Sequence, residues 1–253
     1  DRNYWLWRVR VHDGTFYCAE KGGDLLSSPN GRNWQVISRI PESEGESAQQ
    51  LQEIRAVDHR TTPRFNEADL IFRPDGALWC VSRTKREPEQ HALLYVANPP
   101  YEEWSCIDLK ALIHCPALCE SGGQVYVAGR RDPKAPWIGQ HTPAGNTGIF
   151  RLDKSGLTPI LALPSDGDAA YPGLLSLEEN RLIISYYSQH AYLSGVIEGD
   201  KRRLHHIERW ASMRREAPPP DYPHELSYFK SGPADIFVAE IDLAAEEDTY
   251  RIM

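Results

Sequence analysis

Charged and aromatic side chains stand at the ends of apolar, strand-like runs in this sequence. In residues 66–83, NEADLIFRPDGALWCVSR, Glu67 precedes one apolar run and Arg83 ends the next. Arg130 ends a similar run, and Tyr171 opens another. A carboxylate can accept a proton, and guanidinium groups bind carboxylates through paired hydrogen bonds. These residue types therefore suit a site that binds an acidic ligand.

Each of these residues also has a structural interpretation. Glu67 could be a solvent-facing or strand-capping carboxylate. Arg83 and Arg130 could form salt bridges at the rim with some of the 36 acidic residues. Tyr171 could simply pack beside Pro172, because Tyr-Pro-Gly is an ordinary turn sequence.

Further polar groups stand near the last of these runs. Tyr186, Tyr187 and His190, in SYYSQH, form a polar aromatic cluster suited to stacking on a sugar ring and bonding its hydroxyls. Only one of the two tyrosines faces the channel side, because side chains alternate along a strand. His190 could instead be a structural histidine. Asp168, in DGDAAY, either orients a ligand hydroxyl or caps its turn.

The elements that must position these side chains are short β-strands. Runs of β-branched and aromatic residues, broken by Gly, Pro, Asp and Asn, dominate the sequence. Helical periodicity is confined to short stretches such as residues 47–57 and 209–215. The sequence therefore predicts an all-β fold.

A repeated unit organises these strands. Each copy is a strand, a Gly or Asn turn, and a second strand that ends seven residues after the turn. Successive turns are 62, 47 and 57 residues apart, which suits the four-stranded antiparallel blades of a propeller around a central channel. Arg83, Arg130 and Tyr187 share one position in the repeat, so we expect them at the same end of the channel. The four inner strand pairs are residues 7–21, 68–83, 116–130 and 172–187.

Outer strands and one long insertion account for much of the remaining chain. The outer strand pairs of the first three units are predicted in residues 22–38, 91–109 and 147–163, and residues 234–243 are predicted to belong to the fourth unit. Residues 191–233 are predicted to be a surface insertion in the last blade. We expect residues 1–253 to form a single propeller domain of four to six blades, either a reduced propeller or one that lacks its N-terminal blades.

Composition excludes some partners. The formal net charge is −8, so bulk electrostatics give no attraction to nucleic acid or to an anionic membrane surface. The sequence has no run of about 18 apolar residues that could span a bilayer. The location stays open, and a secreted or periplasmic location is one alternative if a leader sequence is missing.

The cysteine and histidine spacings predict no metal or cofactor. The five cysteines form no CxxC pair, so we expect free thiols in preference to a disulfide framework or a zinc site. His205 and His206 are adjacent, and adjacent side chains on a strand point to opposite faces.

Two short segments resemble a known hairpin motif. SSPNGRNW, residues 27–34, resembles the Asp box, S-x-D-x-G-x-x-W, of sialidase-type propellers, with Asn30 in place of the usual Asp. In such a hairpin a side-chain oxygen caps the turn, Gly31 takes a positive φ, and Trp34 packs beneath. ANPPYEEW, residues 97–104, resembles a further decayed copy.

Three longer segments resemble the bacterial exo-α-sialidase-like, BNR-repeat propeller proteins. They are, in the family's order, residues 66–83, 116–130 and 163–190. The last is similar to the family's G-D-x-S-Y-P-G-L and S-Y-Y-S-S-H patterns, with Ala170 and Gln189 in place of two serines. The resemblance implies a sialidase-type β-propeller that binds a glycan or a small acidic sugar.

The resemblance also implies roles for individual residues. Tyr171 matches the nucleophilic tyrosine, and Glu67 matches the base that helps to deprotonate it. Arg83 matches an arginine that binds the substrate carboxylate, and Arg130 stands where a further one could lie. Arg8 is a loose substitute for the first arginine, which the family carries in an R-I-P motif that is absent here.

A tyrosine nucleophile suits an acidic sugar for an electrostatic reason. A carboxylate nucleophile would be repelled by a substrate carboxylate on the anomeric carbon, whereas a neutral tyrosine is not. The family's acid residue has no match here, and Asp13 and Asp24 are the candidates that remain. Two functions are therefore expected: a sialidase-like retaining exo-glycosidase, or a non-catalytic carbohydrate-binding or scaffold propeller that has lost the acid and the first arginine.

Overall fold

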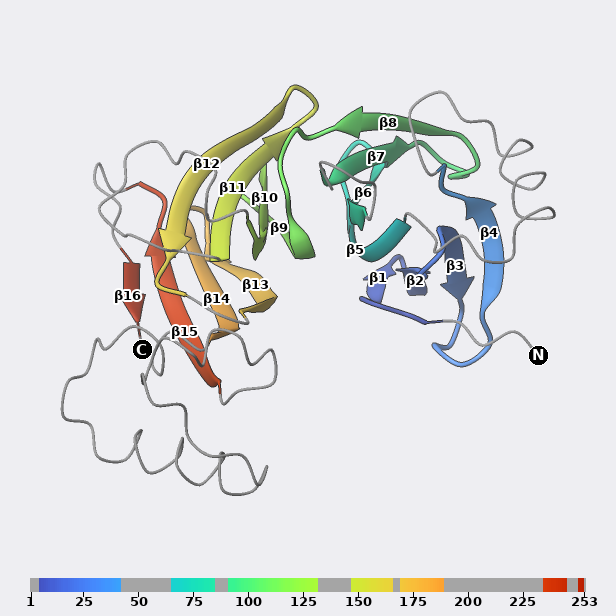
Figure 1. Ribbon diagram of the computed structural model, residues 1–253. Coiled ribbons are helices and arrows are strands. Elements are labelled where there is room, and N and C mark those ends of the chain that lie inside the picture. The colour runs from blue at the N-terminus through green and yellow to red at the C-terminus, as the bar shows by residue number, and fades with distance from the viewer. Residues whose placement is uncertain are drawn as a thin grey trace, which may run out of the picture.

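Four antiparallel sheets of four strands make up the described part of the protein (Figure 1). The computed structural model describes residues 5–41, 65–84, 91–131, 147–165, 169–188, 234–244 and 250–252. Within these ranges all regular elements are strands and none is a helix. The sheets are arranged as the blades of a four-bladed β-propeller, which confirms the predicted fold class.

Each sheet is built from four described strands that follow one another in the chain, and the order of the strands in the sheet is the same as their order in the chain. The first sheet contains β1 (Arg10–His12), β2 (Thr15–Ala19), β3 (Asp24–Ser28) and β4 (Gln35–Arg39). The second contains β5 (Phe65–Phe72), β6 (Leu78–Thr84), β7 (Leu93–Ala97) and β8 (Trp104–Asp108). The third contains β9 (His114–Ser121), β10 (Gln124–Arg130), β11 (Thr147–Asp153) and β12 (Gly156–Leu163). The fourth contains β13 (Ala170–Glu178), β14 (Arg181–Ser188), β15 (Asp235–Asp242) and β16 (Tyr250–Ile252).

Local turn chemistry explains the hairpins. Between β5 and β6, Gly76 has a φ of 83° and donates its N–H to the carbonyl of Arg73, while the Asp75 carboxylate accepts the N–H of Ala77. A residue with a side chain would be strained at this φ, so glycine sets the turn. In the β3–β4 hairpin, Asn30 Oδ1 accepts two backbone N–H groups at 2.9 Å, and Gly31 has a φ of 70°.

Both faces of the second and third sheets are apolar because each of these two sheets packs against two neighbours. In β6, Leu78 and Cys80 face the first sheet, whereas Trp79 and Val81 face the third. A third core joins the third and fourth sheets. Alternating side chains of one strand thus enter two different cores, which is why these strands read as continuous apolar runs.

The inner strands are tied together by one buried carboxylate. Asp69 of β5 accepts hydrogen bonds from Arg10 Nε at 2.8 Å and from the backbone N–H of Leu118 at 2.7 Å, and its side chain has no exposed surface. Arg10 also donates to the Leu118 carbonyl at 2.8 Å. This ion pair therefore joins the first three sheets along their inner edges.

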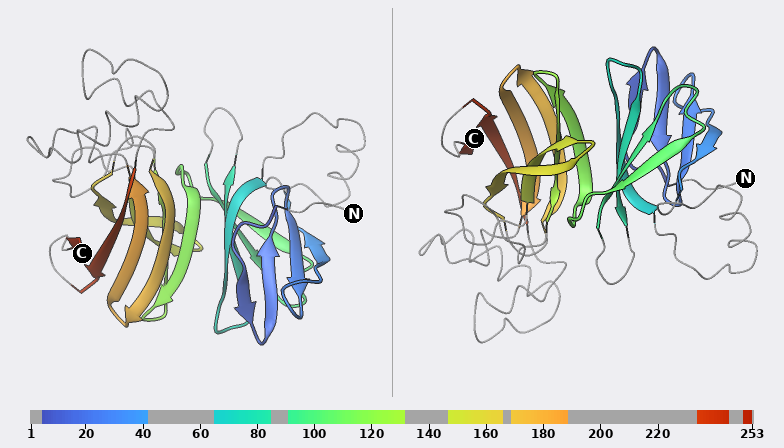
Figure 2. Two further views of the ribbon diagram at one scale, coloured as in Figure 1. Left: turned by 90° about the horizontal axis from the view of Figure 1, so that it is seen from below. Right: turned by 90° about the horizontal axis from the view of Figure 1, so that it is seen from above.

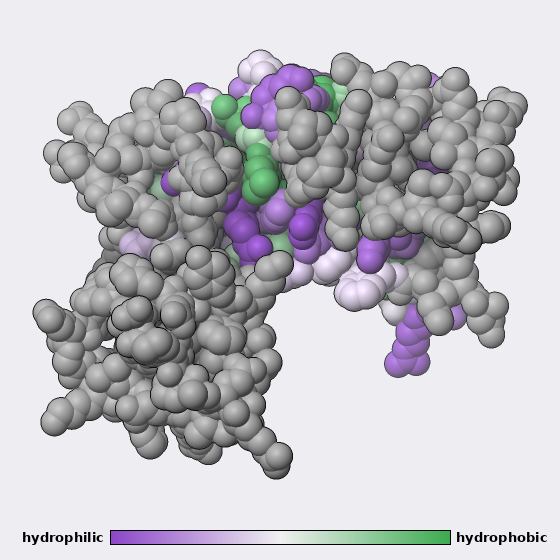
Figure 3. Space-filling view, in the orientation of Figure 1, coloured by the Kyte–Doolittle hydropathy of each residue, from purple (hydrophilic) through white to green (hydrophobic). Residues whose placement is uncertain are grey.

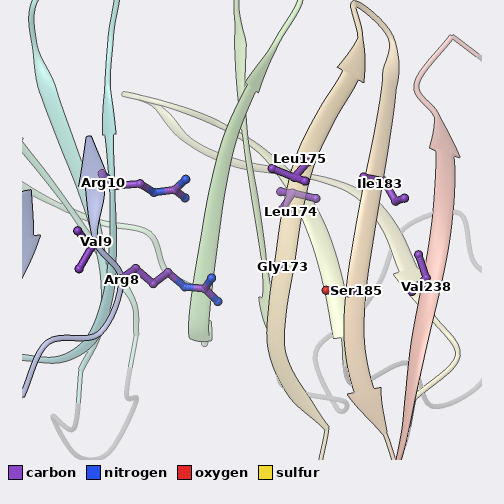
Figure 4. Close-up of a pocket in the computed structure, with 9 residues that line it drawn as sticks. All are labelled: Arg8, Val9, Arg10, Gly173, Leu174, Leu175, Ile183, Ser185 and Val238. Carbon is purple, nitrogen blue, oxygen red and sulfur yellow. The ribbon is translucent and has the colours of Figure 1, made fainter. Parts of the chain in front are cut away.

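The first and fourth sheets meet less closely than the other neighbours. Among the described residues no hydrophobic core cluster joins them, and Val11 and Leu175 keep 60% and 63% of their surface exposed. A cavity of about 520 Å³ lies here, and Figure 4 shows Arg8 and Arg10 extending from the chain at the start of the first sheet toward β9, with Gly173, Leu174 and Leu175 of β13 beyond it. On the face of the molecule drawn in Figure 3, hydrophobic residues (green) and hydrophilic residues (purple) lie next to one another near the centre.

Several predicted features fall outside the described residues. These are the insertion at 191–233, with His205 and His206, and the helical stretches at 47–57 and 209–215. The single-domain prediction stays a prediction. The five cysteines are free, and in the described ranges no helix is long and apolar enough to cross a membrane.

Candidate functional site

A tyrosine and a glutamate from different blades meet at the N-terminal ends of the inner strands. Tyr171, at the start of β13, donates its hydroxyl to Glu67 Oε1 at 2.8 Å across 104 residues of sequence. Only 7% of the Glu67 side chain is exposed, whereas Tyr171 keeps 48% of its surface exposed. The pair therefore combines a buried carboxylate with a phenol that solvent can reach.

The second oxygen of Glu67 is fully engaged. Glu67 Oε2 accepts the backbone N–H of Cys115 at 3.0 Å, the Cys115 thiol at 3.1 Å and Arg83 Nη1 at 3.1 Å. These three donors fix the orientation of the carboxylate. As a result, Oε1 is the oxygen presented to Tyr171.

The environment sets the protonation states of this pair. Burial raises the pKa of Glu67, but the hydrogen bonds from Cys115 and Tyr171 and the charge of Arg83 outweigh it and hold the pKa below its ordinary value. Burial and the hydrogen bond to the Glu67 carboxylate raise the pKa of Tyr171 well above its ordinary value. Near neutral pH the glutamate is ionised and the tyrosine carries its proton.

Irregular backbone positions these groups. Tyr171 and Cys115 have φ angles of 46° and 53°, which is uncommon for residues with a side chain, and each is followed by a proline. The inner strand of each of these three blades also shifts its register against the second strand. The shift lies near Glu67 in β5, near Cys115 in β9 and near Tyr171 in β13. Such irregularities turn side chains out of the regular alternation. The side chains at the starts of three equivalent strands can therefore converge on one point.

Three predicted arginines surround this pair. Arg83 contacts Glu67 directly, as described above. Arg130 Nε donates to the Ala169 carbonyl at 2.5 Å, and Arg8 Nη2 donates to the Pro172 carbonyl at 2.5 Å. The structure thus brings Arg8 and Arg130 to the backbone on both sides of Tyr171, where their charge favours an anionic ligand.

The predicted tyrosine cluster is divided by strand alternation. Tyr186 lies in the core, 1% exposed, and donates its hydroxyl to the Pro164 carbonyl at 3.0 Å. Tyr187 points the other way, and its ring centroid lies 6.2 Å from that of Tyr171 with nearly parallel planes. Tyr187 is therefore the tyrosine at the site. Asp168 and His190 lie outside the described residues.

Comparisons with known proteins concern the fold. The sequence matches no protein-family model and no curated protein. Among solved structures, an endo-arabinase from Bacteroides thetaiotaomicron VPI-5482 matches 100% of this chain and 79% of its own, with a TM-score of 0.53 and 10% identity. An endo-1,4-β-xylanase from the same organism matches 99% of this chain and 73% of its own, with a TM-score of 0.52 and 11% identity.

A phage phi92 endosialidase has a similar fold as well. It matches 94% of this chain and 35% of its own, with a TM-score of 0.52 and 12% identity. This chain spans less than half the length of other matched structures, including 40% of a GH43 β-1,3-galactosidase. The protein has the fold of propeller glycoside hydrolases. At these identities the likeness extends to the fold alone.

Three residues at the site were not singled out by the sequence patterns. Trp7 lies with its ring centroid 6.1 Å from that of Tyr171, and its buried indole N–H has no hydrogen-bond partner among the described residues. Cys115 donates to Glu67. Cys115 stands before a proline at the start of its inner strand, as Tyr171 does in the next blade, and this shared position is the signal that could have identified it.

The third such residue is His114, which neighbours Cys115. It is 8% exposed, and neither ring nitrogen has a hydrogen-bond partner among the described residues. Burial, together with the charges of Arg83 and Arg130, lowers its pKa to about 4 despite the nearby carboxylate of Glu67. His114 is therefore a neutral imidazole at neutral pH.

The two suggested acid residues lie elsewhere. Asp13 is exposed in the β1–β2 turn, at the opposite end of the inner strands from Tyr171. Asp24 on β3 is paired with Arg39. Neither is positioned beside Glu67. Within the described ranges, no group of three or more His, Cys, Asp or Glu side chains is arranged to hold a metal ion.

Proposed function

We propose that this protein is a sialidase-like glycoside hydrolase that acts on an acidic sugar with retention of configuration. Tyr171 is the nucleophile and Glu67 is its base. The observation that carries the proposal is the 2.8 Å hydrogen bond from the Tyr171 hydroxyl to Glu67 Oε1. A nucleophile within hydrogen-bond reach of an oriented base is the arrangement that covalent catalysis requires.

In the first step the sugar is transferred to the Tyr171 oxygen. As the Tyr171 oxygen forms a bond to the anomeric carbon, Glu67 Oε1 takes the phenolic proton and the glycosidic C–O bond breaks. The departing oxygen takes a proton from solvent or from a general acid. In the second step water attacks the anomeric carbon and gives one proton to the solvent or to the group that protonated the departing oxygen, while the bond to Tyr171 breaks and the tyrosine oxygen regains its proton from Glu67.

The opposed pKa shifts bear on the timing of this step. Because the pKa of Glu67 is lowered and that of Tyr171 is raised, proton transfer before bond formation is strongly uphill. Transfer becomes favourable once the phenol oxygen bonds to carbon and its acidity rises. The directions of the two pKa shifts therefore favour a concerted attack over a preformed phenolate.

Local charge supports an acidic substrate. The formal net charge of the protein is −8, yet Arg8, Arg83 and Arg130 all lie around Tyr171. Guanidinium groups bind carboxylates well, and the similar fold of glycoside hydrolases is consistent with a glycan as the ligand.

A second candidate function is a non-catalytic propeller that binds acidic sugars. One observation favours it: each of the three arginines donates at least one hydrogen bond within the protein, to Glu67, Ala169 or Pro172. The arginines could then serve to hold the strand starts together. In that case Glu67 and Tyr171 would keep their shape without turnover.

A fluorogenic panel of sialosides and uronides separates the two functions. We expect turnover by the wild type, a loss of roughly 10³-fold or more in Tyr171→Phe, and a loss of about 10²-fold to 10⁴-fold in Glu67→Gln. Tyr17→Phe, a half-buried tyrosine of the first sheet, is the matched control and should keep wild-type rates. Saturable binding of acidic sugars with no turnover by any variant would establish the binding protein instead.

A further inference from the structure

A row of four aromatic rings leads away from the Glu67–Tyr171 pair. The ring centroids of Tyr187 and Tyr171 lie 6.2 Å apart, those of Tyr171 and Trp7 6.1 Å, and those of Trp7 and Trp5 5.5 Å. The angles between successive planes are 16°, 23° and 31°. The row thus runs from the fourth sheet, through the proposed nucleophile, to the segment before β1.

The far end of this row is held in place by backbone contacts. Trp5 accepts a hydrogen bond at its carbonyl from the N–H of Lys21 at 3.1 Å, and Leu6 pairs with Glu20. This pairing continues the β1–β2 ladder toward the N-terminus. The position of Trp5 is therefore set by the sheet, although 58% of its surface is exposed.

Core packing does not explain the two tryptophans. A side chain as exposed as Trp5 removes little apolar surface from water. The indole N–H of Trp7 is buried without a partner among the described residues, which costs free energy. The exposed indole of Trp5 offers an apolar face to a ligand.

A positive charge accompanies Trp5. The Lys21 ammonium lies 5.1 Å from the centroid of the Trp5 ring. The flat face of a sugar ring carries C–H groups that pack on an indole, while its hydroxyl and carboxylate oxygens accept hydrogen bonds at the edge. A lysine beside the indole favours a sugar that carries a carboxylate.

We propose that Trp5, Trp7 and Lys21 form a second sugar subsite next to Tyr171, so that the site takes an acidic oligosaccharide of at least two residues. The inference rests on the proposed function of the Glu67–Tyr171 site. One acidic residue lies against Tyr171 among the arginines, and the next stacks on the tryptophans with its carboxylate toward Lys21.

Calorimetry with two probes tests the subsite: sialic acid and its α-2,8-linked dimer. We expect the wild type to bind the dimer at least about tenfold more tightly than the monosaccharide, because the dimer adds a stacked ring and a charged hydrogen bond. Trp5→Ala should bring the ratio of the two affinities close to one, and Trp5→Phe, which keeps an aromatic face, should restore most of it. Lys21→Gln should lower the ratio and remove most of its dependence on salt.

Matched controls and outcomes make the test decisive. Leu177→Ala removes an apolar side chain of similar exposure, 50%, and Lys154→Gln removes an exposed lysine, so both should keep the wild-type ratio. Equal affinity of the wild type for the two probes, or an unchanged ratio in Trp5→Ala, overturns the subsite and leaves the proposed function intact. Failure of both probes to bind overturns the subsite and the proposed function together.

Discussion

Cys115 holds one oxygen of Glu67 with two donors, its backbone N–H at 3.0 Å and its thiol at 3.1 Å. The two contacts come from a residue with a positive φ at the start of β9, in the sheet next to that of the glutamate. Cys115 therefore positions the carboxylate so that its other oxygen meets Tyr171. In this role a cysteine acts through its hydrogen bonds and not as a nucleophile, since burial raises its pKa to about 12.

Removal of the Cys115 thiol should shift the pH dependence of the site. Cys115→Ala keeps the backbone donor and loses the thiol donor, so the lowered pKa of Glu67 moves back toward its ordinary value. Because Glu67 must be ionised to accept a proton, the acid limb of the kcat profile should move to higher pH.

Two companion variants isolate the effect of that thiol. Cys115→Ser retains a hydroxyl donor and should keep the acid limb near its wild-type position. Cys106→Ala, in the outer strand β8, should leave it unchanged. An acid limb that stays in place in Cys115→Ala would show that the backbone N–H and Arg83 alone orient the carboxylate.

Arg83 should contribute to the recognition of a substrate carboxylate. Its Nη1 is bound to Glu67 Oε2, but its buried Nε has no hydrogen-bond partner among the described residues. In Arg83→Ala the affinity for an acidic sugar should fall by about 1.5 to 3 kcal/mol, as for a charged hydrogen bond.

Comparison with the methyl ester of the same sugar makes this prediction specific. The ester lacks the charge, so its affinity should change much less than that of the acid in titration calorimetry. Arg32→Ala, at an exposed position of the β3–β4 hairpin, should affect neither ligand. If Arg83→Ala weakens acid and ester equally, Arg83 has a structural role toward Glu67 only.

Asp69 should be important for stability and not for chemistry. Its buried carboxylate accepts hydrogen bonds from Arg10 and from the backbone N–H of Leu118, and both would lose this acceptor in Asp69→Ala. We expect the free energy of unfolding in urea to fall by about 2 to 4 kcal/mol. Asp69→Asn keeps an acceptor and should lose less, and Asp13→Ala, at an exposed turn, should change stability by less than about 0.5 kcal/mol. A small effect of Asp69→Ala would mean that packing between the sheets holds the inner strands without the ion pair.

His114 should make stability depend on pH. Its pKa is lowered to about 4 in the folded protein, whereas an unfolded histidine titrates near 6.5, so protonation favours unfolding. The stability is complete above about pH 6.5 and decreases as the pH falls toward 4, by roughly 2 to 3 kcal/mol.

Unfolding curves at pH 7 and at pH 4.5 measure this dependence. His114→Gln carries no titrating group and should lose less stability over this range than the wild type. His12→Gln, which replaces a histidine on the first sheet, should retain the wild-type difference. Identical pH dependence in the wild type and His114→Gln would place the acid sensitivity in other groups.

The turn residues and the apolar runs were enough to predict the blades. The turns at Gly14, Gly76, Gly123 and Asn180 separate the paired inner strands where the sequence placed them, and the outer strands follow in the same order. This succeeded because a turn depends on a few adjacent residues and because side-chain alternation acts within one strand. The resemblance to sialidases also singled out Glu67, Tyr171, Arg83, Arg130 and Arg8, and the position in the repeat singled out Tyr187; the structure brings these six residues together.

Contacts between blades could not be predicted in this way. The partner of Arg83, the two hydrogen bonds of Cys115 and the approach of Trp7 to Tyr171 all join residues that are distant in the sequence. They depend on how three sheet interfaces pack and on register shifts at the strand starts, which no local pattern encodes.

The sequence by itself therefore determined the all-β class, the four repeated hairpins and the residue types available for chemistry. Only the tertiary structure decided that Tyr171 donates to Glu67, that Tyr187 and not Tyr186 lies beside it, and that Trp7 lies on its other side. The physical reason is one of range. Turn and strand preferences act over a few residues, whereas the site forms only where strand starts from separate blades converge at the inner edges of their sheets.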